Sequence, residues 1–282
     1  MGEWEAHVDR ATFEARREED ALSERHYSAL TLLLQAYADV GLLQAGWAGP
    51  LHDCCPNRGS CWSEPGALRP PADKAGVSVP WIGKRYFEHR ILVIGMNFND
   101  WGGLDAHWSM CRWHICALSQ GEHGHQNRFF AYGALTYVTL LRASRESKAL
   151  PHWDGRAPQD LAYEWNDCAF LQAVKCCPSQ AKSKPYQEMF DNCPPLLLKR
   201  ELEILDPTVV LLLGNSVRDA VRPLLVRDFG LEYDLPGPLE RDRFFLNGSQ
   251  RTVFSCVHPS TPNRKQWKES VKQLEALLDE SR

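Results

Sequence analysis

A chain of 282 residues can bury a sizeable core, either as one large domain or as two small ones. Its apolar share of 44% and charged share of 24% are those of a globular protein, and no apolar run approaches the roughly 18 residues of a membrane span. The N-terminus has neither the basic nor the apolar region of a signal peptide, so we expect a cytoplasmic protein whose 10 cysteines form no disulfide framework.

The formal charge of −4 argues against indiscriminate binding of nucleic acids, but the charge is unevenly distributed along the chain. Lysines and arginines outnumber acids in residues 251–272, whereas the first 25 residues are acidic. A local basic surplus of this kind fits contacts with phosphates, although on a helix it is more often a solvated face.

The first part of the chain has helical periodicity over residues 11–43, and we expect residues 1–47 to form a helical extension. Residues 48–83 are rich in proline, glycine and cysteine and lack periodicity, which predicts an irregular loop segment. We therefore expect the main domain to span residues 48–282.

Four apolar runs within that domain alternate with helical patterns. A parallel sheet with helices on both faces is the arrangement that this alternation predicts. The fold class is therefore α/β, with three α/β/α layers around a central four-stranded parallel sheet. The expected strands are Ile91–Gly95, Ala169–Val174, Thr208–Leu213 and Thr252–Val257, and the expected helices are Arg128–Arg142, Tyr186–Leu205, Val217–Val226 and Lys265–Leu278.

Polar side chains follow the first and the last of these strands. Asn97 stands two residues after Gly95, and His258 follows Val257 directly. Ligands of open α/β sheets bind at the carboxyl ends of the strands, so both residues are candidates for chemistry. Taken alone, Asn97 is better explained as a loop asparagine in an unusual backbone conformation, and the histidine at the second strand end is what favours chemistry.

Cysteines gather in two regions of the sequence. Cys54, Cys55 and Cys61 lie in the irregular loop, and Cys176, Cys177 and Cys193 follow the second expected strand. Four thiolates suit tetrahedral zinc or a cubane iron–sulfur cluster. No Cys-x-x-Cys pair is present, so the spacing also leaves open that these are buried structural cysteines.

Several short motifs stand in an order that resembles one enzyme family. They are Val79–Gly83 with the strand Ile91–Gly95, Gly95-Met96-Asn97, Arg128–Ala131, Ala173–Cys176 with Cys193 and Pro207–Gly214, His258-Pro259-Ser260, and Asn263-Arg264. Together they resemble the uracil-DNA glycosylase superfamily, most closely its iron–sulfur-containing bacterial and archaeal branches. The similarity covers roughly residues 50–280 and leaves residues 1–45 outside.

This resemblance implies a hydrolase that flips a base out of DNA and breaks its N-glycosidic bond. Asn97 would position the attacking water, and His258 would stabilise the negative charge that gathers on the departing base. Phe130 would stack on the base and Gln172 would hydrogen-bond its edge. We also assign base binding to Gly95, Met96, Phe98 and Asn215.

The resemblance further implies a [4Fe-4S] cluster, with zinc as the lesser alternative, and DNA as the partner of a monomeric protein. The expected cluster ligands are Cys55, Cys61, Cys176 and Cys193, although the doublets with Cys54 and Cys177 leave the choice open. The expected DNA contacts are Ser260, Asn263, Arg264 and Lys265; the bland alternative is the start of a helix capped by Ser260 or Thr261.

Two departures from the family pattern leave the target base open. Phe98 stands where the family usually has proline, and Gln172 stands where the strict uracil enzymes have asparagine. The alternatives are therefore a glycosylase for a modified pyrimidine, such as one of phage DNA in a defence role, a glycosylase for a deaminated purine, or a DNA-binding module without strong catalysis. A nucleotide-binding α/β protein is disfavoured because no G-x-G-x-x-G turn follows the first strand.

Overall fold

The computed structural model describes residues 23–43, 56–61, 80–96, 134–146, 148, 162–176, 185–235, 239–258 and 264–280. These residues belong to two compact units. The first unit comprises residues 1–81, 96–109 and 171–205, and the second comprises residues 82–95, 110–170 and 206–282. None of the described helices is long and apolar enough to cross a membrane.

The four predicted strands are confirmed, and they are neighbours in the middle of the sheet. They are β2 (Ile91–Gly95), β3 (Cys168–Gln172), β4 (Val209–Leu213) and β7 (Ser249–Cys256), in the spatial order β3-β2-β4-β7. β2 runs parallel to β4, and β4 runs parallel to β7. Their apolar side chains are buried along nearly the whole length, as expected for parallel strands that are covered on both faces.

The sheet is larger than predicted, because it has seven strands and is mixed rather than purely parallel. The three strands that the sequence analysis missed are β1 (Trp81–Ile82), β5 (Glu232–Leu235) and β6 (Glu240–Leu246). β6 pairs antiparallel with both β5 and β7. The β6–β7 hairpin turns at Asn247 and Gly248, whose φ angles of 50° and 73° are those that a tight two-residue hairpin requires.

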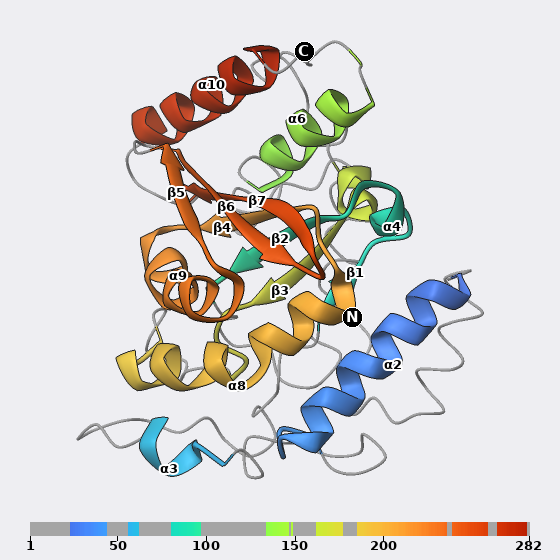
Figure 1. Cartoon of the computed structure of the whole chain (residues 1–282), viewed down its shortest axis with the longest axis vertical. Helices are drawn as coiled ribbons and strands as arrows, with labels where there is room; N and C mark the ends of the chain where they lie inside the picture. Colours follow the sequence, from blue (N-terminus) through green and yellow to red (C-terminus); the bar gives the residue numbers. More distant parts are fainter. Residues whose placement is uncertain are drawn as a thin grey trace, which may run out of the picture. The chain divides into compact units, whose positions relative to one another are not determined.

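Helices cover the two faces of the sheet in the second unit. Helix α9 (Asn215–Phe229) packs on β4, β6 and β7, whereas α6 (Leu135–Arg145) packs on β2 and contacts α10 (Arg264–Glu280) (Figure 1). Tyr137 of α6 joins the two helices through a hydrogen bond of 3.0 Å between its Oη and Oγ of Ser270. This arrangement confirms the predicted α/β/α layering.

Gly83 ends the Val79–Gly83 motif that precedes the first predicted strand, and its surroundings show why this residue is a glycine. Its N–H donates to the carbonyl of Cys168 over 3.0 Å. A Cβ atom at this position would lie 2.4 Å from the carbonyl oxygen of Trp165 and 2.5 Å from that of Asn166. Only glycine allows the two backbone segments to approach so closely.

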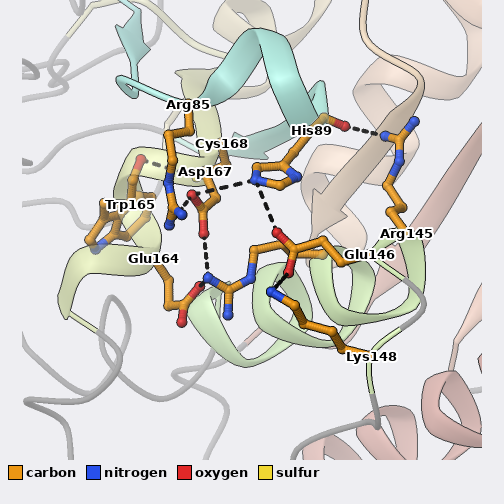
Figure 2. A network of polar contacts seen from close by, with 10 residues as sticks. Arg85, His89, Arg145, Glu146, Lys148, Glu164, Trp165, Asp167 and Cys168 are labelled. Carbon is orange, nitrogen blue, oxygen red and sulfur yellow. Dashed lines mark hydrogen bonds and ion pairs between the residues drawn. The ribbon is translucent and has the colours of Figure 1, made fainter.

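A buried network of charges joins the segments that lead into β2 and β3. Asp167 is fully buried and pairs with Arg85 over 2.6 Å and with Arg142 over 2.9 Å (Figure 2). Arg142 of α6 also contacts Glu164 over 2.9 Å, in the 3₁₀ helix η5 (Ala162–Asp167). The carboxylate of Asp167 thus connects η5 with α6 and with Arg85, which immediately precedes the short helix α4 (Tyr86–His89).

The first unit is built around α8 (Gln187–Leu205), against which both α2 (Glu24–Asp39) and α3 (Arg58–Cys61) pack. Tyr37 of α2 donates its hydroxyl hydrogen bond to Glu201 of α8, and Lys175 forms an ion pair of 2.8 Å with the same carboxylate. α3 lies in the segment predicted to be irregular, and the predicted boundary at residue 47 falls outside the described residues.

Candidate functional site

His258 is the best-placed candidate for chemistry in the second unit. It follows β7 two residues after Cys256, at the end where the neighbouring parallel strand β4 reaches Gly214. A Cβ atom on Gly214 would lie 3.0 Å from Cβ and 3.2 Å from Cδ2 of His258, and Gly214 has a φ of +95°. Glycine is therefore required at residue 214 for two reasons, and the position of the imidazole depends on it.

The environment of His258 sets its protonation state. Burial lowers the pKa of the imidazole from its usual value of 6.5, because a low-dielectric surrounding disfavours the charged ring. The ring is then neutral at pH 7 and carries one N–H donor and one acceptor nitrogen. A neutral imidazole can therefore donate its one N–H to an oxygen on which negative charge develops.

Four further predicted residues of the second unit lie at helix starts or at a strand end. Gly95 is the last residue of β2, and Asn215 is exposed as the first residue of α9. Arg264 is the first residue of α10, and Lys265 follows it with an exposed side chain. A cation at this position is accessible to a phosphate, which fits the predicted contact with DNA.

Gln172 is the candidate base-reading residue, and it lies in the first unit at the end of β3. Its side chain is only 2% exposed, and its Oε1 has no hydrogen-bond partner among the residues that the structure describes. Its backbone carbonyl accepts a hydrogen bond from Lys175 Nζ. The backbone carbonyl of Met96 accepts a hydrogen bond of 3.0 Å from the N–H of Val174, two residues after Gln172. A buried amide oxygen without a donor is unfavourable unless an ordered water or a ligand satisfies it.

Three of the four predicted cluster cysteines lie in the described segments. Cys193 belongs to α8, Cys61 ends α3, and Cys176 follows β3. Cys61 of α3 is buried, and its Sγ lies 3.5 Å from Nδ2 of Asn192 and 3.7 Å from the carbonyl oxygen of Glu188. Cys193, one residue after Asn192, shares a hydrogen bond with Cys176. That hydrogen bond lowers the pKa of Cys193 to about 7, against the opposing effect of its burial. A thiol with such a pKa is readily deprotonated, as a metal ligand must be.

The donor chemistry of these thiols therefore suits a metal or cluster, although the described residues contain no group of three or more His, Cys, Asp or Glu side chains that is arranged to hold a metal ion. The remaining buried cysteines of the described segments behave differently. Burial raises the pKa of Cys168 and of Cys256, which keeps both thiols protonated.

The remaining predicted site residues lie outside the described segments. They are Asn97, Phe98, Phe130, Ser260, Asn263 and Cys55, together with the alternative ligands Cys54 and Cys177. Their assignment continues to rest on their motifs.

Sequence reasoning missed the residues that hold the candidate site in place. Gly214 was recognised as a strand end, but its contact with His258 was not predicted. The pairing of Tyr37 with Glu201, which are 164 residues apart, carries no local signal. Lys175 and Glu201 look like ordinary surface residues in the sequence, and only their complete burial marks them as special.

The sequence model of the uracil DNA glycosylase superfamily matches residues 108–281, which is more than half of the chain. A search of curated proteins found no match. The family match includes His258, Gly214 and Gln172, and it begins beyond Asn97 and Cys61.

Proposed function

Because the chain belongs to the uracil DNA glycosylase superfamily, we propose that it is a monofunctional DNA glycosylase. It hydrolyses the N-glycosidic bond of a base that has been flipped out of DNA and leaves an abasic site. The observation that carries this proposal is the neutral, buried His258 at the end of β7, packed against a glycine that no other residue can replace. It lies within the part of the chain that the family match covers.

His258 supplies the main electrostatic contribution to the reaction. As the glycosidic bond breaks, negative charge gathers on an oxygen of the base, and the imidazole N–H donates a hydrogen bond to it. A donor that is already oriented stabilises the transition state more than the ground state, and removal of one such donor lowers rates by about 10²–10³-fold. Asn97 orients the water that attacks the sugar carbon; its amide does not titrate, so it positions the water rather than deprotonating it.

Gln172 reads the edge of the flipped base. Its unpaired, buried Oε1 favours a base that presents an N–H donor, as uracil and the amino-bearing modified pyrimidines do. Leaving this oxygen without a donor in the complex is unfavourable, so Gln172 contributes to the choice of base. Gln172 and the long insertion of residues 101–127 also fit a pocket for a modified pyrimidine, such as one of phage DNA.

A [4Fe-4S] cluster held by Cys55, Cys61, Cys176 and Cys193 completes the proposal. It is supported by the burial of the last three thiols beside α8 and by the lowered pKa of Cys193. When bound, such a cluster would link the loop of residues 54–61 covalently to α8. No electron transfer is needed for hydrolysis of the glycosidic bond, so the role of these cysteines is structural.

The experiment that tests the proposal is base release from a panel of oligonucleotides, detected as alkali-labile abasic sites. The panel contains uracil, hypoxanthine, xanthine, hydroxymethylcytosine and glucosylated cytosine, each in single and double strands. We expect release of a pyrimidine, and loss of that activity in Asn97→Ala. Intact strands for every base, with a folded protein that still binds DNA, would refute glycosylase activity on these substrates and favour a DNA-binding module.

A further inference from the structure

Three buried side chains connect Gln172 with the N-terminal helix α2. The carbonyl of Gln172, at the end of β3, accepts a hydrogen bond from Nζ of Lys175. Lys175 pairs over 2.8 Å with Glu201 of α8, and Glu201 accepts the hydroxyl hydrogen bond of Tyr37 of α2. Tyr37, Glu201 and Lys175 thus form a relay, the Tyr37 relay, between α2 and Gln172. All four residues belong to the first unit.

The members of the Tyr37 relay depend on one another because water does not reach them. Each is at most 1% exposed, so the ammonium needs a counter-charge and the carboxylate needs donors. Nζ of Lys175 contacts both carboxylate oxygens of Glu201, and it lies 5.9 Å from the centroid of the Tyr37 ring, which is a cation–π distance. Tyr37 therefore contacts both charged partners, and a change at Tyr37 affects the geometry of the whole ion pair.

The Tyr37 relay joins a helix outside the family match to residues inside it. The match covers residues 108–281, which include Gln172, Lys175 and Glu201 and exclude α2. α2 packs on α8, and phenylalanine at residue 37 would fill nearly the same space as tyrosine. The hydroxyl therefore adds one thing to that packing, the hydrogen bond to Glu201.

The backbone around Gln172 determines where its side chain points. The N–H of Val174 donates to the carbonyl of Met96 over 3.0 Å, and Lys175 turns back to the carbonyl of Gln172. The side chain of Gln172 is 2% exposed, and no residue of the described segments binds its Oε1. The direction of this oxygen therefore depends on the backbone that carries the side chain, and so on Lys175.

We propose that the Tyr37 relay positions Gln172 for its contact with the flipped base, so that α2 contributes to the choice of base without touching it. The inference rests on the proposed function, in which Oε1 of Gln172 accepts an N–H of the base. A hydrogen bond weakens steeply when its distance and angle depart from the optimum, so a small shift of the Gln172 backbone reduces this contact. Tyr37, Glu201 and Lys175 are then positioning residues.

A double-mutant cycle on the full-length protein tests whether Tyr37 acts through Gln172. The single-turnover rate of base release is measured on the panel oligonucleotide whose base the wild-type protein releases. Tyr37→Phe should lower this rate by about tenfold, because the amide that receives the base is displaced. In the Gln172→Ala protein, the same substitution should change the rate by less than about twofold, because the group that it positions is already absent.

Tyr137→Phe is the matched control. Tyr137 is also buried, and its hydroxyl donates a hydrogen bond of 3.0 Å to Ser270, but both residues lie in the second unit and have no contact with the Tyr37 relay. The control removes the same atom from the same type of residue and lowers stability in the same way. It should leave the rate unchanged in both backgrounds. Circular dichroism establishes that all variants are folded.

Hydrogen exchange gives a readout that needs no activity. Mass spectrometry follows a peptide that contains residues 172–176 in the ligand-free protein, and the N–H of Val174, bonded to Met96, reports local opening of this segment. Exchange should be faster by about tenfold in Tyr37→Phe, because the hydrogen bond to the carboxylate is lost. Tyr137→Phe should exchange like the wild-type protein in this peptide.

The two readouts separate this inference from the proposed activity. Equal exchange in Tyr37→Phe and Tyr137→Phe overturns the inference even if the wild-type protein releases a base. An equal loss of rate in the presence and absence of the Gln172 side chain also overturns it, because Tyr37 then acts on stability alone. Faster exchange in Tyr37→Phe without release of any base supports the connection between Tyr37 and Gln172 and refutes the activity.

Discussion

The buried group of Tyr37, Lys175 and Glu201 makes the sharpest prediction about stability. All three side chains are at most 1% exposed, and Glu201 receives both the Tyr37 hydroxyl and the Lys175 ammonium. Glu201→Gln keeps the shape of the side chain and removes its charge. The ammonium of Lys175 then stays buried without a counter-charge, which costs roughly 3–5 kcal/mol. Domains are stable by only about 5–15 kcal/mol, so the loss is large.

Tyr37→Phe probes the same group from α2. Burial and the nearby Glu201 raise the pKa of Tyr37 well above its usual value, so the hydroxyl remains a donor at every practical pH. Loss of a hydrogen bond to a charged acceptor costs roughly 1.5–3 kcal/mol. Because the two substitutions affect one carboxylate, the double variant should lose clearly less than the sum of the single losses.

Urea denaturation of the full chain, followed by tryptophan fluorescence, measures these losses. Gln35→Ala is the matched control, because Gln35 lies on the same helix and makes an exposed hydrogen bond of 2.7 Å to Asp39. It should change the free energy of unfolding by no more than about 0.5 kcal/mol. If Glu201→Gln is as mild as this control, the reasoning from burial and pairing is wrong.

Three further predictions concern the site. Gly214→Ala should lower the rate of base release by up to about 10²-fold, since its Cβ would displace His258. Gly230→Ala is the control: Gly230 also has a positive φ but no atoms near its Cβ position, so this variant should lose only about 1 kcal/mol of stability and keep its rate. Equal rates in both variants would contradict the prediction. Because the pKa of His258 lies below 6.5, the rate of base release should be level above pH 6.5 and should fall on acidification. The free energy of unfolding should also fall on acidification, since the imidazole of the unfolded chain binds a proton at a higher pH than that of the folded protein. A midpoint of the pH–rate profile above 6.5 would argue against the assignment. Cys193→Ser should abolish visible absorption of the purified protein, and Cys168→Ser should retain it; a colourless wild type, purified without oxygen, would count against the cluster.

The centre of the fold could be predicted from the sequence because each parallel strand is a continuous apolar run. β2 was predicted with its observed limits, and the limits of β4 differ by one residue. The β5–β6 pair was missed, although β6 buries alternate residues at Asp242, Phe244 and Leu246. The Asn247-Gly248 pair between two strands was the available signal for this hairpin.

The candidate site could be predicted only where local sequence determines position. His258 was placed at a strand end because apolar residues lead directly to it. The ion pair of Arg218 with Glu240 could not be anticipated in the same way, because the two residues come from different elements, α9 and β6. The buried ion pair of Lys175 with Glu201 joins the segment that follows β3 to α8, and no periodicity in either segment reports that contact.

The most direct test of the central claim is the single-turnover rate at which free base leaves DNA, compared between the wild-type protein and His258→Ala. The substrate is the oligonucleotide that the panel identifies, and mass spectrometry quantifies the released base and the abasic strand. The account predicts intact base as the product and a rate lower by about 10²–10³-fold in the variant, with DNA affinity nearly unchanged. An unchanged rate in His258→Ala would contradict it.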